Sequence, residues 1–588
     1  MGTISDKLMR IINTKEDIRQ ALISKGYDVP TSIPFKEYAK MILDLPCNAD
    51  SFPDIEGIVA RYSALGLTNE QMAENPVWKD LTGNGHDLQM KNFAWGRMSG
   101  VGGYVDNWNS SADWGINNYW VNSHTDHKLQ LITASTVVQM KSNNIYNAEN
   151  VYKNILNVNG LTEAVNKGSV GGLRISATDP ITSKAIKAFS FYTDGVIQIS
   201  FDDVLQDYCV VYFVYGNNTN DIDITIEQLP LYPGALVFDG VDDYGVCDNF
   251  PILTKEKGYT VVALRQWITY NPNAISAIAT NASDRSFNGA FTFENYNKGA
   301  EQTISYGATQ ISLQYSKSPF SWQTTSKYNG FNIANGNKDA TNSLVLGRSY
   351  PQRNDFANFA IWELVFLDHD ATEEELTKIK DYFVKTYPWL FPDQAWTTVG
   401  KTNEDEDRAT IANITGNGND LILSNFGFAE GSGYNEQGEY AGYLVTDGVD
   451  DKITSSTFEM GNDWTVIGDW ELINTGKNDN AGIVKFDSIV IYNYNPILIN
   501  IKNGRNILIP DQNTVNAICS DGRIYSKDWK ESIYNEETES TSKNFLTIGY
   551  SGNVYTKIAF KNLAIYPTVL SREDCIKAYN YLQTLKAK

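Results

Sequence analysis

The chain has 588 residues, of which 42% are hydrophobic and 20% charged, and its formal net charge is −22. This composition is that of a protein with several packed cores, and the length predicts about four domains. The negative charge argues against binding to nucleic-acid backbones and to anionic membranes.

The five cysteines are few and widely spaced, so the sequence implies no disulfide framework. We expect them to be buried thiols in a protein that is assembled in a reducing cytoplasm. Neither a long apolar run nor a signal-peptide pattern is present, so membrane insertion is not expected.

The first 50 residues are predicted to be helical, because their apolar side chains recur at helical spacing. So short a segment rarely folds alone. It is either a helical hairpin that packs on the next domain or an anchor that buries its apolar stripe on partner chains. For the second alternative the contact residues are Leu8, Ile11, Ile12, Ile18 and Leu22.

The rest of the chain contains a duplicated unit. A strand followed by Asp-Gly-Val-Asp-Asp occurs at 235–243 and again at 443–451. In both copies a Thr-Gly-Asn-Gly turn precedes this motif, and a Leu-x-x-Gly segment, a strand and a capped helix follow it. A shared beginning, middle and end predict two domains of one fold. We assign them to residues 51–116 with 231–392, and to 393–588.

The first copy carries an insertion. Gly83 lies 156 residues before Asp239, whereas the equivalent Gly416 lies 31 residues before Asp447. Runs such as Ile222, Ile224 and Ile226, which alternate with polar residues, predict half-buried strands. We therefore predict an inserted all-β module over residues 117–230.

These motifs resemble the concanavalin A-like lectin/glucanase superfamily and, more narrowly, laminin-G-like domains of bacterial and phage proteins. The resemblance rests on the Asp-Gly-Val-Asp-Asp-Tyr turn after a strand, the Leu-x-x-Gly segment and the closing strand with its capped helix. It implies a mainly β fold class: tandem jelly-roll sandwiches with an inserted β-sandwich and a short N-terminal α-helical segment.

Residues 7–43 resemble the N-terminal segments of fibre and tail-associated proteins of phages that infect gut Bacteroidetes, including crAss-like phages. This resemblance implies a virion protein, a head or tail fibre assembled in the host cytoplasm. Such a fibre would attach through its N-terminus to capsid or tail proteins and bind host cell-surface polysaccharide. Because fibres are commonly trimers, it also implies a homotrimer.

The carboxylates of the two acidic turns are candidates for a cation site. Calcium prefers several oxygen ligands, but Asp in a glycine-containing turn also caps backbone N–H groups. Both interpretations stay open for Asp239, Asp242, Asp243, Asp447, Asp450 and Asp451. No other cofactor is expected.

An aromatic cluster is the candidate for sugar binding. Trp108, Trp114, Tyr119 and Trp120 are interleaved with Asn, Ser, Asp and Gly, which are typical of a surface loop. Their rings could stack on sugar rings, or they could fill the joint between the first sandwich and its insertion.

We do not expect an enzyme. Glucanases of the resembled superfamily carry Glu-x-Asp-x-Glu along one strand, and this sequence has no convincing instance of it. Three hypotheses follow: a fibre that binds host glycans, a structural decoration protein that binds other capsid or tail proteins, and a polysaccharide depolymerase whose carboxylates lie in the insertion.

Overall fold

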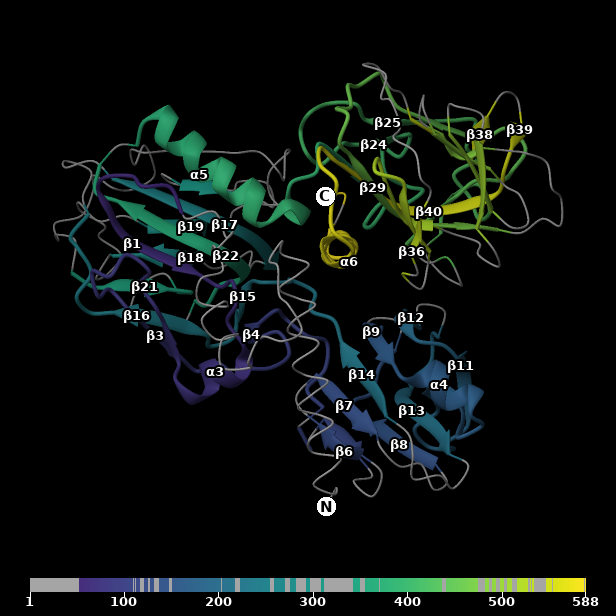
Figure 1. The fold of residues 1–588 in the computed structure, drawn as a ribbon, viewed down its shortest axis with the longest axis horizontal. Helices are drawn as coiled ribbons and strands as arrows, with labels where there is room; N and C mark the ends of the chain where they lie inside the picture. Colours follow the sequence, from purple (N-terminus) through teal and green to yellow (C-terminus); the bar gives the residue numbers. More distant parts are fainter. Residues whose placement is uncertain are drawn as a thin grey trace, which may run out of the picture. The chain divides into compact units, whose positions relative to one another are not determined.

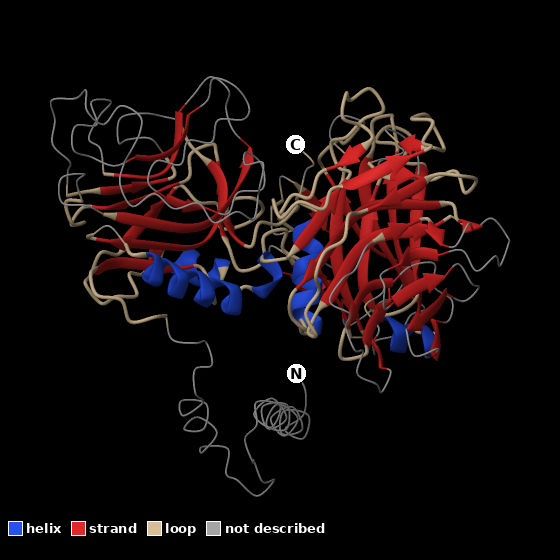
Figure 2. Ribbon diagram, turned by 90° about the horizontal axis from the view of Figure 1, so that it is seen from above, coloured by secondary structure: helices blue, strands red, loops and turns tan. Residues whose placement is uncertain are grey.

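Strands are the commonest regular element of the described chain (Figure 2). The computed structural model describes residues 52–587 with gaps of one to four residues and with longer interruptions at 132–136, 217–222, 254–258, 270–274, 282–291, 297–307, 311–341, 349–354, 474–481, 510–514 and 534–545. Within the described ranges, no helix is long and apolar enough to cross a membrane. The strands form β-sandwich domains, so the predicted mainly β fold class is confirmed.

The first sandwich is built from two six-stranded sheets (Figure 1). One sheet contains β1 (Ile58–Ser63), β4 (Gly100–Val101), β15 (Leu236–Asp239), β17 (Thr260–Thr269), β20 (Ala308–Gln310) and β22 (Asn358–Leu367). The other contains β2 (Val77–Trp78), β3 (Leu88–Lys91), β16 (Tyr244–Cys247), β18 (Ile275–Thr280), β19 (Thr292–Tyr296) and β21 (Leu344–Leu346). Both sheets contribute to one core, in which Phe238 stacks on Phe359 at 4.4 Å. The short helix α3 (Asn69–Glu74) begins at Thr68, whose side chain caps it.

The insertion is a sandwich of two five-stranded sheets with its own core. The first contains β5 (Trp114–Ile116), β8 (Val137–Ser142), β10 (Val170–Thr178), β11 (Ala185–Phe191) and β13 (Cys209–Gly216). The second contains β6 (Val121–His124), β7 (Lys128–Leu131), β9 (Lys153–Asn159), β12 (Gly195–Ser200) and β14 (Ile224–Gln228). Helix α4 (Leu161–Asn166) follows β9. The predicted start at residue 117 is wrong, because β5 already pairs with β8 and Trp108 lies in this core.

A buried polar network joins the two ends of the insertion. The Asp106 backbone N–H donates to Gln228 Oε1 (3.0 Å), and Gln228 Nε2 donates back to the Asp106 carbonyl (3.2 Å). The Tyr152 hydroxyl donates to Asp106 Oδ2 at 2.5 Å. Burial raises the pKa of Asp106 to about 6. The network therefore closes the module at the point where the chain enters and leaves it.

The second sandwich has two eight-stranded sheets. One contains β23 (Gln394–Thr397), β26 (Gly433–Tyr434), β27 (Leu444–Val445), β29 (Thr465–Leu472), β34 (Val515–Cys519), β35 (Arg523–Ser526), β36 (Glu531–Ile533) and β40 (Ile558–Tyr566). The other contains β24 (Thr410–Ile411), β25 (Leu421–Ser424), β28 (Lys452–Thr454), β30 (Gly482–Lys485), β31 (Ile489–Tyr492), β32 (Ile497–Ile501), β33 (Arg505–Ile509) and β37 (Thr547–Ile548). A small ribbon pairs β38 (Tyr550–Ser551) with β39 (Val554–Tyr555), and helix α6 (Arg572–Leu582) ends the domain.

The duplication is visible in the strand pairings. In the first sandwich β15 lies between β4 and β22, and β16 lies between β3 and β21. In the second, β27 lies between β26 and β40, and β28 lies between β25 and β37. The acidic turn therefore connects the two sheets of each sandwich at the same place.

Helix α5 (Glu373–Thr386) belongs, from Glu374 onward, to a separate compact unit whose other described residues are 52–55. Ile379, Tyr382 and Phe383 are its buried residues, and the Tyr382 ring meets the edge of Phe52 at 4.9 Å. The short 3₁₀ helix η2 (Pro388–Leu390) leads into the second sandwich. The predicted anchor residues Leu8, Ile11, Ile12, Ile18 and Leu22 lie outside the described residues.

Candidate functional site

The first acidic turn is held by its own aspartates. Asp239 Oδ1 accepts hydrogen bonds from the backbone N–H groups of Val241 (2.7 Å) and Asp242 (3.3 Å). Gly240, which lies between Asp239 and Val241 in the sequence, has φ +76°, and a Cβ there would lie 2.7 Å from the Asn358 Cβ. This position therefore needs glycine.

Asp243 is the buried member of the turn. Its Oδ2 accepts the Asp239 backbone N–H at 2.9 Å, and its Oδ1 accepts the Ser99 hydroxyl at 2.9 Å. Burial raises the pKa of Asp243 to about 7. The carboxyl group thus ties the turn to the short hairpin that contains Ser99.

The second copy repeats these contacts. Asp447 Oδ1 accepts from Val449 N at 2.7 Å, as Asp239 does from Val241. Asp451 Oδ2 accepts the Asp447 N–H (2.7 Å), and its Oδ1 accepts the Ser432 hydroxyl (3.1 Å). Burial raises the pKa of Asp451 to about 6. Such agreement between distant segments shows that the motif is a structural unit of the fold.

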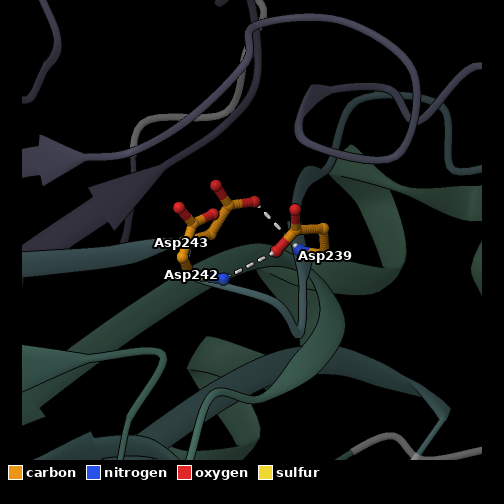
Figure 3. A group of neighbouring side chains, drawn as sticks. All are labelled: Asp239, Asp242 and Asp243. Atoms are coloured by element: carbon orange, nitrogen blue, oxygen red, sulfur yellow. Dashed lines mark hydrogen bonds between the residues drawn. The ribbon is translucent and has the colours of Figure 1, made fainter. Parts of the chain in front are cut away.

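The three carboxylates of each turn also converge. In both turns one oxygen of each aspartate lies within 4.8 Å of the others, and the first trio is drawn in Figure 3. Calcium takes six to eight oxygens. Both oxygens of Asp243 and one of Asp239 already accept hydrogen bonds from the chain. Backbone capping therefore accounts for the arrangement without a cation.

The raised pKa of Asp243 predicts a pH effect on stability. The folded state favours the protonated carboxyl of Asp243. This group therefore stabilises the fold fully when the pH is below its ordinary pKa of 3.8, and the stabilisation is lost as the pH rises through about 7. Asn cannot ionise and can still accept from Asp239 N–H and donate to Ser99. We therefore compare the unfolding temperatures of Asp243→Asn and the natural protein. The value for the variant minus the value for the natural protein should increase from about pH 5 to about pH 8. Thermal unfolding at the two pH values measures this.

The control for this prediction is Asp463→Asn, because Asp463 is exposed and lies in the second sandwich rather than beside Asp243. Its difference from the natural protein should stay constant over the same pH range. Parallel pH profiles for Asp243→Asn and the natural protein would show that Asp243 is ionised in the folded state throughout.

Two of the four aromatic residues predicted to bind sugar are core residues. The side chains of Trp108 and Trp114 are 1% and 2% exposed, and each ring packs edge to face on Tyr212, at 6.0 and 5.6 Å. The prediction that they lie on a surface loop is therefore wrong: both belong to the core of the insertion, and Trp114 reaches it as the first residue of β5, which pairs with β8. Tyr119 and Trp120 lie outside the described residues.

A different aromatic group flanks each acidic turn. Tyr244 follows Asp243 directly and is half-buried. The guanidinium carbon of Arg348 lies over the Tyr244 ring, 4.0 Å from the ring centroid. Phe356 packs beside it at 6.3 Å. In the second sandwich Lys452 occupies the place of Tyr244 in the motif, and its ammonium lies 5.7 Å from the Tyr555 ring centroid. Each rim thus combines an aromatic ring, a cation and exposed acid.

The valines of the two turns are unusually exposed. Val241 is 71% exposed and Val449 is 70% exposed, although neighbouring apolar side chains are buried. The duplicated turns therefore present an apolar tip next to the carboxylates and the aromatic–cation pair. The sequence signal for this rim was the turn motif itself, but the ring and its cation come together only in the fold.

The structure also reveals buried carboxylates that sequence reasoning missed. Glu363 on β22 accepts hydrogen bonds from the Tyr387 hydroxyl (2.8 Å) and from Arg61 Nη2 (3.2 Å). Asp469 on β29 accepts from the Tyr443 hydroxyl (2.9 Å) and lies 3.6 Å from the Lys561 ammonium. Burial raises the pKa of Glu363 despite its basic partner. In each sandwich, therefore, a buried carboxylate on a strand is paired with a basic side chain and a tyrosine hydroxyl.

Comparisons with known proteins give weak similarities. No family model and no curated protein matches the chain. Among solved structures, the binding domain of Paraclostridial Mosquitocidal Protein 1 is 12% identical, with a TM-score of 0.21, and the match covers 32% of this chain and 51% of that one. The Ca²⁺/Man2-bound exoplasmic/lumenal domain of VIP36 is 10% identical, covers 22% and 78%, and has a TM-score of 0.17. Trypanosoma rangeli sialidase in complex with sialic acid is 9% identical, covers 79% and 83%, and has a TM-score of 0.23. These values say nothing about activity.

Proposed function

We propose that the chain is a non-enzymatic glycan-binding protein and that the rims beside its two acidic turns contact the sugar. The observation that carries this proposal is the repeated combination of aromatic ring, cation and exposed carboxylate at equivalent places in both sandwiches. Aromatic faces pack against the C–H groups of sugar rings, while charged groups orient the hydroxyls. Two such rims on one chain would bind a repeating polysaccharide with avidity.

The contacts of the buried carboxylates Glu363 and Asp469 support the proposal that the protein does not hydrolyse the glycan. A retaining glycosidase needs an acid and a nucleophile about 5 Å apart with access to substrate. Glu363 and Asp469 are instead buried and engaged by tyrosine hydroxyls and by Arg61 and Lys561. We assign them a structural role.

We further propose that glycan binding serves attachment of a phage particle to its host. In this setting the chain is a head or tail fibre, residues 1–50 join it to capsid or tail proteins, and three chains assemble. The resemblance of the N-terminal segment supports the setting. The native mass of the full chain and of a chain lacking residues 1–46 tests it: we expect a trimer and a monomer, and equal oligomeric states would remove the assembly role from this segment.

Glycan binding is tested on an array of gut-bacterial capsular polysaccharides. We expect binding by the full chain and a loss of roughly tenfold in affinity for the double variant Tyr244→Ala with Tyr555→Ala, because an aromatic contact contributes about 0.5–1.5 kcal/mol. Tyr192→Ala is the matched control, since that tyrosine is 56% exposed on the insertion, away from both turns in sequence.

The same array measured with calcium and with a chelator tests the cation. Because the turn aspartates are engaged in capping, we expect equal binding in both conditions. Binding that needs calcium, and that Asp242→Asn with Asp450→Asn abolishes, would assign a cation to the turns. Absence of binding to every polysaccharide would favour a structural virion protein that contacts other capsid or tail proteins.

A further inference from the structure

Two cysteines that are 56 positions apart meet in the second sandwich. Cys519 is the last residue of β34, and Cys575 lies in the first turn of α6. Both side chains are buried. The sequence spacing carries no sign of a pair, because the contact depends on how α6 packs on the sheet.

Shared neighbours place the two thiols in one corner of the domain. The Thr465 hydroxyl oxygen lies 3.7 Å from Cys519 Sγ and accepts the Leu570 backbone N–H at 2.9 Å. Cys575 Sγ lies 3.9 Å from the carbonyl oxygen of the same Leu570. The Cys575 thiol is within hydrogen-bonding reach of the Cys519 sulfur.

The surroundings favour a thiolate at Cys519. The hydrogen bond from Cys575 lowers the pKa of the Cys519 thiol, and the nearby Arg523 guanidinium lowers it further. That guanidinium is fixed by its own bonds to Asp521 Oδ2 (2.7 Å) and to the Leu570 carbonyl (3.0 Å). The same hydrogen bond, together with burial, raises the pKa of Cys575. One thiol is thus the better nucleophile and the other its resolving partner.

We propose that Cys519 and Cys575 form a reversible disulfide under oxidising conditions, which joins α6 to β34. This inference does not depend on the proposed function. A disulfide oxidant such as oxidised glutathione supplies the chemistry. The Cys519 thiolate attacks one of its sulfurs and releases one glutathione thiolate, and the deprotonated Cys575 then attacks the mixed disulfide and releases the second. The protein loses two protons and two electrons, and the oxidant becomes two thiols.

Because both sulfurs are buried, the test uses refolding of the full chain. The denatured protein is refolded in a glutathione redox buffer, free thiols are alkylated, and peptides are analysed by mass spectrometry. We expect a linked pair of peptides containing Cys519 and Cys575, about 2 Da lighter than the two reduced peptides together. We also expect the oxidised second sandwich to unfold about 5 °C or more above the reduced one, since the link closes a long loop of the unfolded chain.

Matched variants make the outcome decisive. Cys575→Ser should remove both the linked peptides and the rise in unfolding temperature. Cys209→Ser and Cys247→Ser should retain both, because these buried cysteines lie in the insertion and in the first sandwich. If refolding leaves Cys519 and Cys575 alkylated or joined to glutathione, or links either to another cysteine, the proposal is wrong.

Discussion

Trp108→Ala is expected to destabilise the inserted sandwich by about 3–5 kcal/mol, the usual cost of removing a large aromatic side chain from a core. The indole is almost fully buried among the side chains of both sheets and packs edge to face on Tyr212. Truncation would leave a cavity that a β-sandwich closes only in part, because its strands are fixed by their ladder hydrogen bonds. Denaturant unfolding of the full chain, followed by tryptophan fluorescence and hydrogen exchange of the insertion, measures the loss.

Tyr192→Ala serves as the control for Trp108→Ala, because an exposed aromatic residue of the same module should change stability by less than about 0.5 kcal/mol. Glycan binding through the two large sandwiches should persist in both variants. A Trp108→Ala protein with unchanged unfolding but weakened sugar binding would restore the surface interpretation of this residue.

Gly347→Ala is expected to destabilise the first sandwich by about 2–5 kcal/mol. The glycine of the first Leu-x-x-Gly segment has φ +80°, which costs an L-residue about 1–2 kcal/mol. Its added Cβ would also lie 2.7 Å from the Phe238 ring and 2.8 Å from the Asp243 carbonyl oxygen. Overpacking of this kind costs about 1–3 kcal/mol, because Phe238 is itself held between core neighbours.

Gly549→Ala provides an internal comparison for Gly347→Ala. The second copy has almost the same backbone angle, φ +74°, but its added Cβ would meet the Thr446 methyl group at 3.2 Å. We therefore expect the backbone cost alone, about 1–2 kcal/mol. Equal losses in the two copies, measured by denaturant unfolding, would show that the aromatic ring moves aside and that only the backbone angle matters.

Local motifs allowed much of the fold to be predicted. The Asp-Gly-Val-Asp-Asp and Leu-x-x-Gly segments specify left-handed glycines and capping carboxylates, which depend on neighbours in sequence. Their recurrence identified the duplication, and the longer first copy identified the insertion. The start of the insertion was missed because β5 is three residues long and is surrounded by turn-forming residues.

The candidate sites were harder to predict because they depend on contacts between distant segments. Polar neighbours in sequence suggested that Trp108 lies on the surface, whereas its burial is decided by Tyr212 more than a hundred residues away. Likewise, Arg348 reaches Tyr244, and Cys575 reaches Cys519, only after the sheets have formed. A hydrophobic period or a turn motif carries no information about such pairs.

The most direct test of the account is to incubate the full chain with the polysaccharide that it binds best and to measure both retention and polymer length. We predict that the protein is retained on the polysaccharide, that the chain-length distribution does not change, and that no reducing ends appear. Retention lost in the Tyr244→Ala, Tyr555→Ala double variant would place the contact at the two rims. Shortened polymer and new reducing ends would contradict the account and show that the protein is a depolymerase.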